Sequence, residues 1–349
     1  MVEIENFLQL AESRNISIPE LIRADQVYMP AKPLLSIVAA IIIRSYASGL
    51  DVIGVDHLRK ATDLIKEGKK LMIVSNHQSD ADHSVKSHIF KELGFRELAR
   101  RLFFLGGLKM IEREETKRFM PAENTVFVIT PGDAHNLRNA LLWSKRDNLT
   151  EEQRSIVEAY WENCQALTKA SSEAIHKQMD LGNVLVFYPE GTRTRDKEGR
   201  ISRAPQEIAK LFPDDEETWV LPMMTNGTTN IMTLGDKFGP TRTRLEMVIG
   251  APYPSKEIHE VDIKDIFLRE SRARRADVVM ARLAVLMPDL VVPGDLDFYR
   301  KVYGDYDPRI NNGKYHSESF LDAFQGSFLE SFSVGLRRRL FNLLRIGIE

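Results

Sequence analysis

A histidine and an aspartate lie five residues apart in the stretch LMIVSNHQSDADHSVKSH, residues 71–88. Neighbouring side chains on a helix are three or four residues apart, so we expect His77 in a turn and Asp82 in the first turn of the helix that follows, with Ser79 as its cap. There the carboxylate can hold one ring nitrogen of His77 while the other faces a pocket, which is what a general base needs. The alternative from these residues alone is a helix cap beside a surface histidine.

Two arginines form a second candidate site, directly after an apolar run at 184–188. The run leads into a turn that contains Glu190 and Gly191, where glycine permits a close approach of the backbone. Arg193 and Arg195 are two residues apart, which places both guanidinium groups on one side of an extended segment. Such a pair suits a phosphate group, with each charge-assisted hydrogen bond contributing about 1.5–3 kcal/mol. The alternative is a solvated basic turn, because acidic residues follow directly.

Short apolar runs alternate with helical patterns from residue 52 onward. We expect strands at 52–55, 71–74, 102–105, 125–129, 184–188, 219–224 and 245–249. We expect helices at 57–66, 82–93, 134–145 and 151–179. This alternation predicts an α/β fold with a central, mainly parallel mixed sheet flanked by helices. Ligands bind such sheets beyond the carboxyl ends of the strands, where both candidate sites are expected.

Residues 1–50 are predicted to form a smaller, N-terminal helical region. One helix is expected at 3–13, and Pro19 is expected to open a second. The apolar run 34–43 has about half the length of a helix that spans a bilayer. It is therefore expected either in the protein core or at a membrane surface.

Residues 51–349 are predicted to form the α/β domain, with a helical extension at its C-terminal end. One helix is expected at 262–287 and another at 328–348, which interleaves apolar residues with arginines. A basic amphipathic helix of this kind suits an anionic membrane or an acidic carrier protein. It can equally pack on the core with its arginines in water.

The overall composition, with 43% hydrophobic and 28% charged residues, is typical of a globular protein. Lys plus Arg number 48 against 50 for Asp plus Glu, a net charge of −2, so no basic field indicates a nucleic-acid partner. The single cysteine, Cys164, excludes an internal disulfide and is typical of a reducing compartment. The N-terminus lacks the basic region of a signal peptide, so we expect a cytoplasmic protein.

Three stretches, in this order along the chain, resemble sequence blocks of the glycerolipid acyltransferases. His77 and Asp82 resemble the H-x4-D block. GGLKMIER, residues 106–113, is similar to the block G-x-x-F-I-x-R at Gly107 and Arg113, with a methionine in place of the phenylalanine. YPEGTRTR, residues 188–195, resembles F-P-E-G-T-R-S-R. With a partial match to a fourth block at 220–222, the resemblance covers roughly residues 74–226.

The resemblance implies transfer of an acyl group from a thioester of coenzyme A or acyl carrier protein to glycerol 3-phosphate or lysophosphatidate, in phospholipid biosynthesis. His77, oriented by Asp82, would take the proton from the attacking hydroxyl, and no metal or other cofactor is expected. The residues expected to bind or shape the acceptor site are Gly107, Arg113, Glu190, Gly191, Arg193 and Arg195. The long insertion at 114–179 and the lack of a spanning helix are most similar to the soluble plastid-type glycerol-3-phosphate acyltransferases, with peripheral membrane contact as a further expectation.

Two other function classes are compatible with the same residues. The cluster of His77, Asp80, Asp82 and His83 allows a metal-dependent hydrolase, although Gln78 and Asp80 stand where the metallo-β-lactamase pattern has histidines. A non-enzymatic protein that binds membranes or a carrier protein is the second alternative. Elemental analysis and an assay for loss of the thioester distinguish these classes from an acyltransferase.

Overall fold

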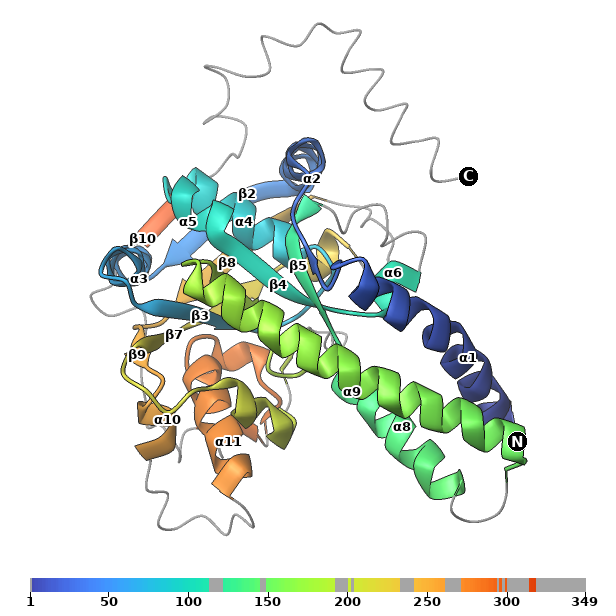
Figure 1. Cartoon of the computed structure of the whole chain (residues 1–349). Coiled ribbons are helices and arrows are strands. Elements are labelled where there is room, and N and C mark those ends of the chain that lie inside the picture. The colour runs from blue at the N-terminus through green and yellow to red at the C-terminus, as the bar shows by residue number, and fades with distance from the viewer. Residues whose placement is uncertain are drawn as a thin grey trace, which may run out of the picture.

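The structure is a computed structural model, and it describes residues 2–112, 122–144, 149–191, 200–201, 204–232, 242–260, 271–293, 295–296, 299 and 314–317. One mixed sheet of ten strands forms its centre (Figure 1). The strands lie in the order β1-β5-β4-β6-β3-β7-β8-β2-β10, and β9 pairs with β7. Their bounds are Tyr28–Met29 (β1), Ala47–Ile53 (β2), Lys70–Ser75 (β3), Leu102–Gly107 (β4), Asn124–Val128 (β5), Val184–Phe187 (β6), Thr218–Asn226 (β7), Thr243–Ile249 (β8), Tyr253–Pro254 (β9) and Lys314–Ser317 (β10).

Most of the sheet is parallel. The adjacent strands β5, β4, β6, β3 and β7 all run in one direction, and β8 and β2 pair in parallel with each other. Antiparallel pairing joins β7 to β8 and adds the strands β1, β9 and β10. The predicted α/β fold with a mainly parallel mixed sheet is therefore confirmed.

Helices cover both faces of this sheet (Figure 1). Buried apolar residues of α2, α3, α4 and α5 pack on one face, and those of α1, α8, α9 and α11 belong to the core cluster on the other. The helix bounds are Val2–Arg23 (α1), Pro33–Tyr46 (α2), Val55–Lys66 (α3), Asp82–Glu92 (α4), Arg96–Arg101 (α5), Lys109–Glu112 (α6), Pro131–Ser144 (α8), Glu151–Asp180 (α9), Glu257–Glu260 (α10) and Ser271–Ala284 (α11). Short 3-10 helices span Gln206–Leu211 (η2), Thr228–Asn230 (η3) and Pro288–Leu290 (η4).

Every strand predicted from the sequence is present, and so are the helices predicted at 57–66, 82–93, 134–145 and 151–179, each with its ends shifted by a few residues. The strand expected at 52–55 instead begins at Ala47 and ends at Ile53. It ends there because Gly54, with a φ of 88°, turns the chain and Val55 begins α3. Of the helix expected at 262–287 the described part is α11. The helix expected at 328–348 lies outside the described residues.

The prediction that Pro19 opens a second helix is wrong, because α1 is continuous from Val2 to Arg23 with Pro19 inside it. Contacts with α9 explain the difference. The Asn15 side chain donates to the carbonyl of Ile156 (3.0 Å) and accepts from the amide of Asn163 (2.9 Å). These contacts hold the chain in helical geometry just before the proline, where a local rule predicts a break.

The N-terminal helices are in contact with the α/β core. Helix α1 contributes buried residues to the core cluster that contains α9, and β1 pairs with β5 at an edge of the sheet. In α2, Ala39 and Ile43 are buried while Leu34 and Ile37 are 71% and 44% exposed. No helix within the described residues is both long enough and apolar enough to cross a membrane. The division of the chain at residue 50 stays a prediction.

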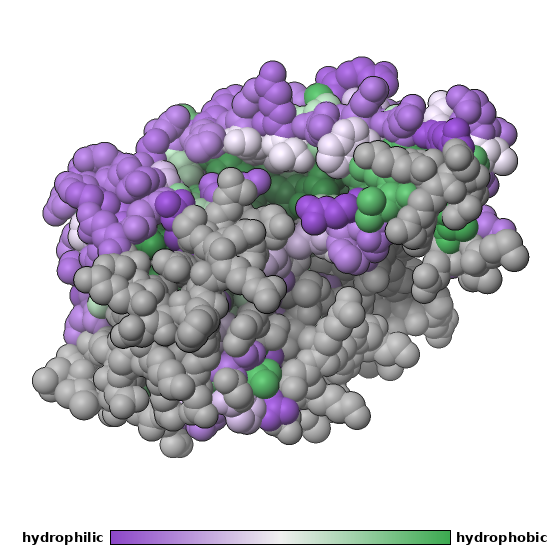
Figure 2. Space-filling view, turned by 90° about the horizontal axis from the view of Figure 1, so that it is seen from below, coloured by the Kyte–Doolittle hydropathy of each residue, from purple (hydrophilic) through white to green (hydrophobic). Residues whose placement is uncertain are grey.

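Hydrophobic residues gather in one place on the surface of the molecule. Figure 2 shows this face from below the view of Figure 1, with hydrophobic residues in a hollow that hydrophilic residues border.

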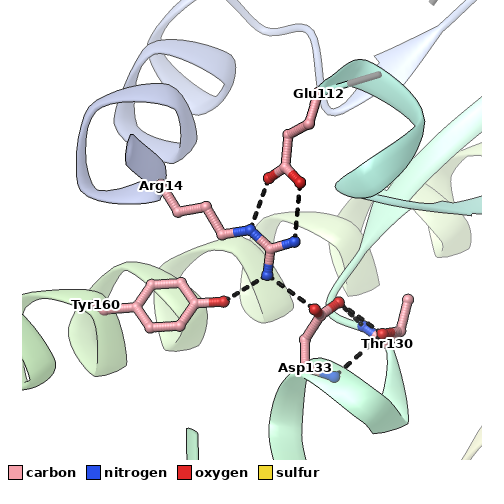
Figure 3. A network of polar contacts seen from close by, with 5 residues as sticks. All are labelled: Arg14, Glu112, Thr130, Asp133 and Tyr160. Carbon is pink, nitrogen blue, oxygen red and sulfur yellow. Dashed lines mark hydrogen bonds and ion pairs between the residues drawn. The ribbon is translucent and has the colours of Figure 1, made fainter. Parts of the chain in front are cut away.

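One buried guanidinium joins four helices (Figure 3). Arg14 of α1, fully buried, donates Nε and Nη2 to the two carboxylate oxygens of Glu112 in α6, at 2.6 and 3.1 Å. Its Nη1 donates to Asp133 Oδ1 in α8 (2.8 Å) and to the Tyr160 hydroxyl in α9 (2.7 Å). Burial opposes the charge of Asp133, but Arg14 and a hydrogen bond from Thr130 outweigh it and lower the pKa of that carboxyl. The four helices are therefore held together by charge as well as by apolar packing.

Replacing Arg14 should destabilise the fold strongly. Arg14→Met keeps much of the side-chain volume but leaves the Asp133 carboxylate buried without its cation, which typically costs about 3–5 kcal/mol. The matched control is Arg59→Met, because Arg59 pairs with Asp56 on the surface of α3 and both side chains are more than half exposed. An exposed pair contributes roughly 0–1 kcal/mol.

Urea unfolding of the three proteins measures the difference. Adding Asp133→Asn to Arg14→Met should recover part of the loss, since it removes the buried charge. Equal losses in Arg14→Met and Arg59→Met would show that the network is not stabilising.

Candidate functional site

The turn after β3 is fixed by hydrogen bonds to a distant strand. Strand β3 is buried over almost its whole length and ends at Ser75. The side chain of Asn76, the next residue, donates to the carbonyl of Thr225 in β7 (2.8 Å) and accepts from the backbone N–H of the same residue (2.8 Å). Because β3 and β7 are parallel neighbours, this pairing holds the turn at the carboxyl ends of both strands. His77 follows at once, and its place in the turn agrees with the prediction.

His77 and Asp82 are in direct contact. His77 Nδ1 lies 2.9 Å from Asp82 Oδ2, and the side chains are 13% and 1% exposed. The same carboxylate oxygen accepts the backbone N–H groups of Gln78 (2.7 Å) and Ser79 (3.1 Å). Ser79 Oγ accepts the N–H of Ala81 (3.2 Å), inside the turn, so the predicted serine cap of the helix is wrong. The prediction that the carboxylate contacts one ring nitrogen of His77 is correct.

The environment of Asp82 determines which nitrogen of His77 carries the proton. Burial opposes the charge of Asp82, but the charge of Lys86 and the hydrogen bond with His77 outweigh it, so the pKa of Asp82 is lowered. An ionised carboxylate only accepts hydrogen bonds, so Nδ1 of His77 must be the donor. In a neutral ring with Nδ1 protonated, Nε2 has a free lone pair. The pair therefore presents Nε2 as a base.

Aromatic rings stack around the pair. Tyr188, directly after β6, stacks on His77 with ring centroids 4.1 Å apart and planes at 13°. His83 of α4 stacks on Phe104 of β4 (4.4 Å) and lies 5.3 Å from Tyr188. Burial, and then the nearby His77, lower the pKa of His83 to about 3, so this imidazole is neutral. Burial also raises the pKa of Tyr188 well above its usual value, so the phenol is neutral too.

The described acceptor-site candidates lie at the same edge of the sheet. Gly107 ends β4, and Glu190 and Gly191 follow β6, so all three are at carboxyl ends of strands parallel to β3. Glu190 is buried. A Cβ on Gly107 would lie 2.5 Å from Thr130 Cγ2, and one on Gly191, which has a φ of 68°, would lie 2.6 Å from Pro131 Cγ. Both glycines are therefore required by close packing against the segment that begins α8.

The three predicted phosphate ligands, Arg113, Arg193 and Arg195, lie outside the described residues. The described part of the chain contains no group of three or more His, Cys, Asp or Glu residues that could hold a metal ion. The cluster around His77 that allows a metal-dependent hydrolase is therefore not arranged as such a group. Cys164 is a free, buried cysteine in α9, and burial raises the pKa of its thiol to about 11.

Sequence reasoning missed one functional candidate, Lys86, and assigned two others differently. In the sequence, Tyr188 stands where the F-P-E-G-T-R-S-R block has phenylalanine, and His83 belongs to the cluster that allows a metal site. Lys86 lies four residues after Asp82, so the helical spacing that places both on one face of α4 was visible in the sequence. Its burial was not, because a lysine in a polar helix is normally solvated.

The neutral His83 makes the stability depend on pH. Its folded pKa, about 3, is below the value of 6.5 expected when unfolded, so between these values the unfolded chain binds a proton that the folded chain does not. Stability therefore falls as the pH falls below 6.5, by roughly 2 kcal/mol between pH 7 and pH 5 for this residue alone. His83→Phe keeps an aromatic ring between Phe104 and Tyr188 and should remove this part of the pH dependence.

Urea unfolding at both pH values provides the measurement. Burial also lowers the pKa of His88 to about 3. The pH dependence of stability that comes from His88 therefore remains in His83→Phe. His135→Phe, at an exposed position on α8, is the control and should leave the slope as it is. An unchanged slope in His83→Phe would mean that His83 accepts a proton in the folded protein.

Comparison with known proteins adds one match. Residues 50–212 match the family model described as Acyltransferase. No curated protein matches the chain. The matched segment runs from β2 to the end of the short helix η2, so it includes His77, Asp82 and the two glycines that pack against the start of α8. Residues 50–212 therefore resemble an acyltransferase domain, and the match supports acyl transfer in glycerolipid synthesis as the general activity.

Proposed function

We propose that this protein transfers a fatty acyl group from the thioester of coenzyme A or acyl carrier protein to a hydroxyl of glycerol 3-phosphate, in phospholipid biosynthesis. The observation that carries the proposal is the His77–Asp82 pair. Its 2.9 Å contact orients the ring, and its position at the carboxyl ends of β3, β6 and β4 is where an α/β sheet binds ligands.

The proposed reaction is a direct transfer. His77 Nε2 removes the proton of the acceptor hydroxyl as that oxygen attacks the thioester carbonyl carbon. The carbon–oxygen bond forms, the carbon–sulfur bond breaks, and the thiolate leaves with the proton from His77. Asp82 stabilises the imidazolium that exists between these two proton transfers. The carbon–sulfur bond of the donor is replaced by a carbon–oxygen bond to the acceptor with no change of oxidation state, so no cofactor is required.

The acceptor phosphate is proposed to bind Arg193 and Arg195, with Arg113. Gly107, Glu190 and Gly191 would shape this side of the site. In support, these three residues lie at the same sheet edge as His77. Arg193 and Arg195 follow Gly191 by two and four residues in the sequence, and Arg113 directly follows α6. Lysophosphatidate carries the same phosphate and a free hydroxyl, so mass spectrometry of the products formed from both acceptors decides between them.

We propose a cytoplasmic protein with peripheral membrane contact, because the acylated product is a lipid. The exposed apolar residues Leu34 and Ile37 on α2 support such contact.

Loss of the proposed base should abolish most of the turnover. His77→Ala should lower kcat by roughly 10²–10⁴ in a protein that still folds, because it removes general-base catalysis. Product formation from acyl-coenzyme A and glycerol 3-phosphate is measured by mass spectrometry. His135→Ala, on the exposed side of α8, should be as active as the wild type. Wild-type turnover in folded His77→Ala would overturn the mechanism.

Loss of a proposed phosphate ligand should weaken acceptor binding selectively. Arg193→Ala or Arg195→Ala removes a charge-assisted contact of about 1.5–3 kcal/mol, so KM for glycerol 3-phosphate should rise roughly tenfold to over a hundredfold if chemistry is slow. The donor KM should stay the same. Lysine at either position should restore only part of the affinity, because an ammonium lacks the planar fork of a guanidinium.

Arg59→Ala, an exposed arginine of α3, is the control for the loss of one positive charge. A raised donor KM with an unchanged acceptor KM would move these arginines to the carrier or coenzyme site.

A further inference from the structure

A lysine is buried beside the His77–Asp82 pair. Lys86 lies on α4 one helical turn after Asp82 and is 1% exposed. Its Nζ makes no hydrogen bond to any described residue and lies 5.0 Å from the centroid of the Tyr188 ring. His77 stacks on the same ring, with centroids 4.1 Å apart. An ammonium in such a place is stabilised only by nearby negative charge and by the face of the ring.

The negative charge is that of Asp82. Asp82 is itself 1% exposed, and its Oδ2 already accepts from His77 Nδ1 and from two backbone N–H groups. The charge of Lys86 is the largest of the influences that favour the ionised form of this carboxyl. Asp82 therefore faces two groups that can carry positive charge, Lys86 and His77. Burial lowers the pKa of Lys86, and the negative charge of Asp82 opposes that effect.

This balance decides the protonation of His77. A buried carboxylate with no other cation attracts a proton to the nearest base, because an ion pair is more stable there than a lone charge. A second cation on the carboxylate removes much of that attraction. We propose that Lys86 is a positioning residue of the active pair, whose ammonium balances the charge of Asp82 and so keeps His77 neutral and able to accept a proton. The proposal rests on the proposed function of His77 as the base.

The other described groups that face the pair do not supply this charge. His83 and Tyr188 are neutral, for the reasons given above. Thr228 of η3 gives Asp82 a hydrogen bond without charge. Glu123, before β5, and Asp80, in the turn, are acidic groups near Tyr188, and burial raises the pKa of Glu123. Among these described residues, Lys86 is therefore the remaining source of positive charge, and its ammonium depends on Asp82, whose charge raises the pKa that burial lowers.

The test is the pKa of His77 in the intact free protein. NMR titration of the labelled histidine rings, with the His77 signal assigned from its loss in His77→Gln, measures it without any turnover. Lys86→Met replaces the lysine by an unbranched side chain of similar length and should raise the pKa of His77 by about one unit or more. The acid limb of the pH profile of kcat/KM should move upward by the same amount.

The matched control is Lys91→Met, which removes the same charge from the same helix about 7.5 Å further along its axis than Lys86. It should leave the pKa of His77 where it is. Lys86→Arg keeps the charge and should stay closer to the wild type than Lys86→Met. If Lys86→Met does not fold, Lys86→Gln, which keeps a polar end, is subject to the same criterion.

An unchanged pKa of His77 in the Lys86 variants, or an equal shift in Lys91→Met, would overturn the proposal. So would a lower rate at every pH with no movement of the acid limb, because that is what a purely structural role predicts. The NMR result does not depend on which reaction the protein catalyses. A shift of the His77 pKa without acyl transfer in the wild type would therefore contradict the proposed function and leave the role of Lys86 intact.

Discussion

The buried charge of Asp82 is the constraint on which the rest of the site depends. A carboxylate that is 1% exposed is stable only when donors and positive charge surround it. The backbone N–H groups of Gln78 and Ser79 can reach it because the chain turns sharply between β3 and α4. That same turn brings His77 into contact with the carboxylate, although His77 precedes Asp82 by five residues. In a continuous helix, side chains five residues apart would not meet. The geometry of the proposed base is therefore a consequence of satisfying one buried charge.

The sheet determines where this turn lies. Strand β3 is flanked by β6 and β7, both parallel to it, so three carboxyl ends meet at one edge. Each neighbour contributes there: β6 delivers Tyr188 to the face of His77, and β7 supplies Thr225, which holds Asn76 across 149 residues of sequence. A pair of residues close in sequence is thus positioned by segments far from it. This explains why the pair can be recognised locally but its environment cannot.

The sequence predicted what local patterns determine. Periodicity and turn residues were sufficient for the central strands and helices, and the spacing of His77 and Asp82 was sufficient for their contact. The misses are places where distant contacts decide. Pro19 should end a helix by local rules, but the contacts of Asn15 with α9 keep α1 continuous. Lys86 should be solvated by composition, but Tyr188, about a hundred residues later, covers it. Such contacts have no signature in a single sequence.

The network of Arg14 connects α1 to the other side of the site. Its partner Glu112 directly precedes Arg113, and Asp133 binds Thr130, whose methyl group leaves no room for a Cβ at Gly107. The neighbouring Pro131 excludes one at Gly191 in the same way. Helix α1 therefore acts on the segments proposed for the acceptor, whereas the His77–Asp82 pair is held by its own turn and by β7. Within the described chain, different segments thus hold the proposed base and the proposed acceptor site. A change that destabilises α1 should therefore weaken acceptor binding more than it alters the His77–Asp82 pair.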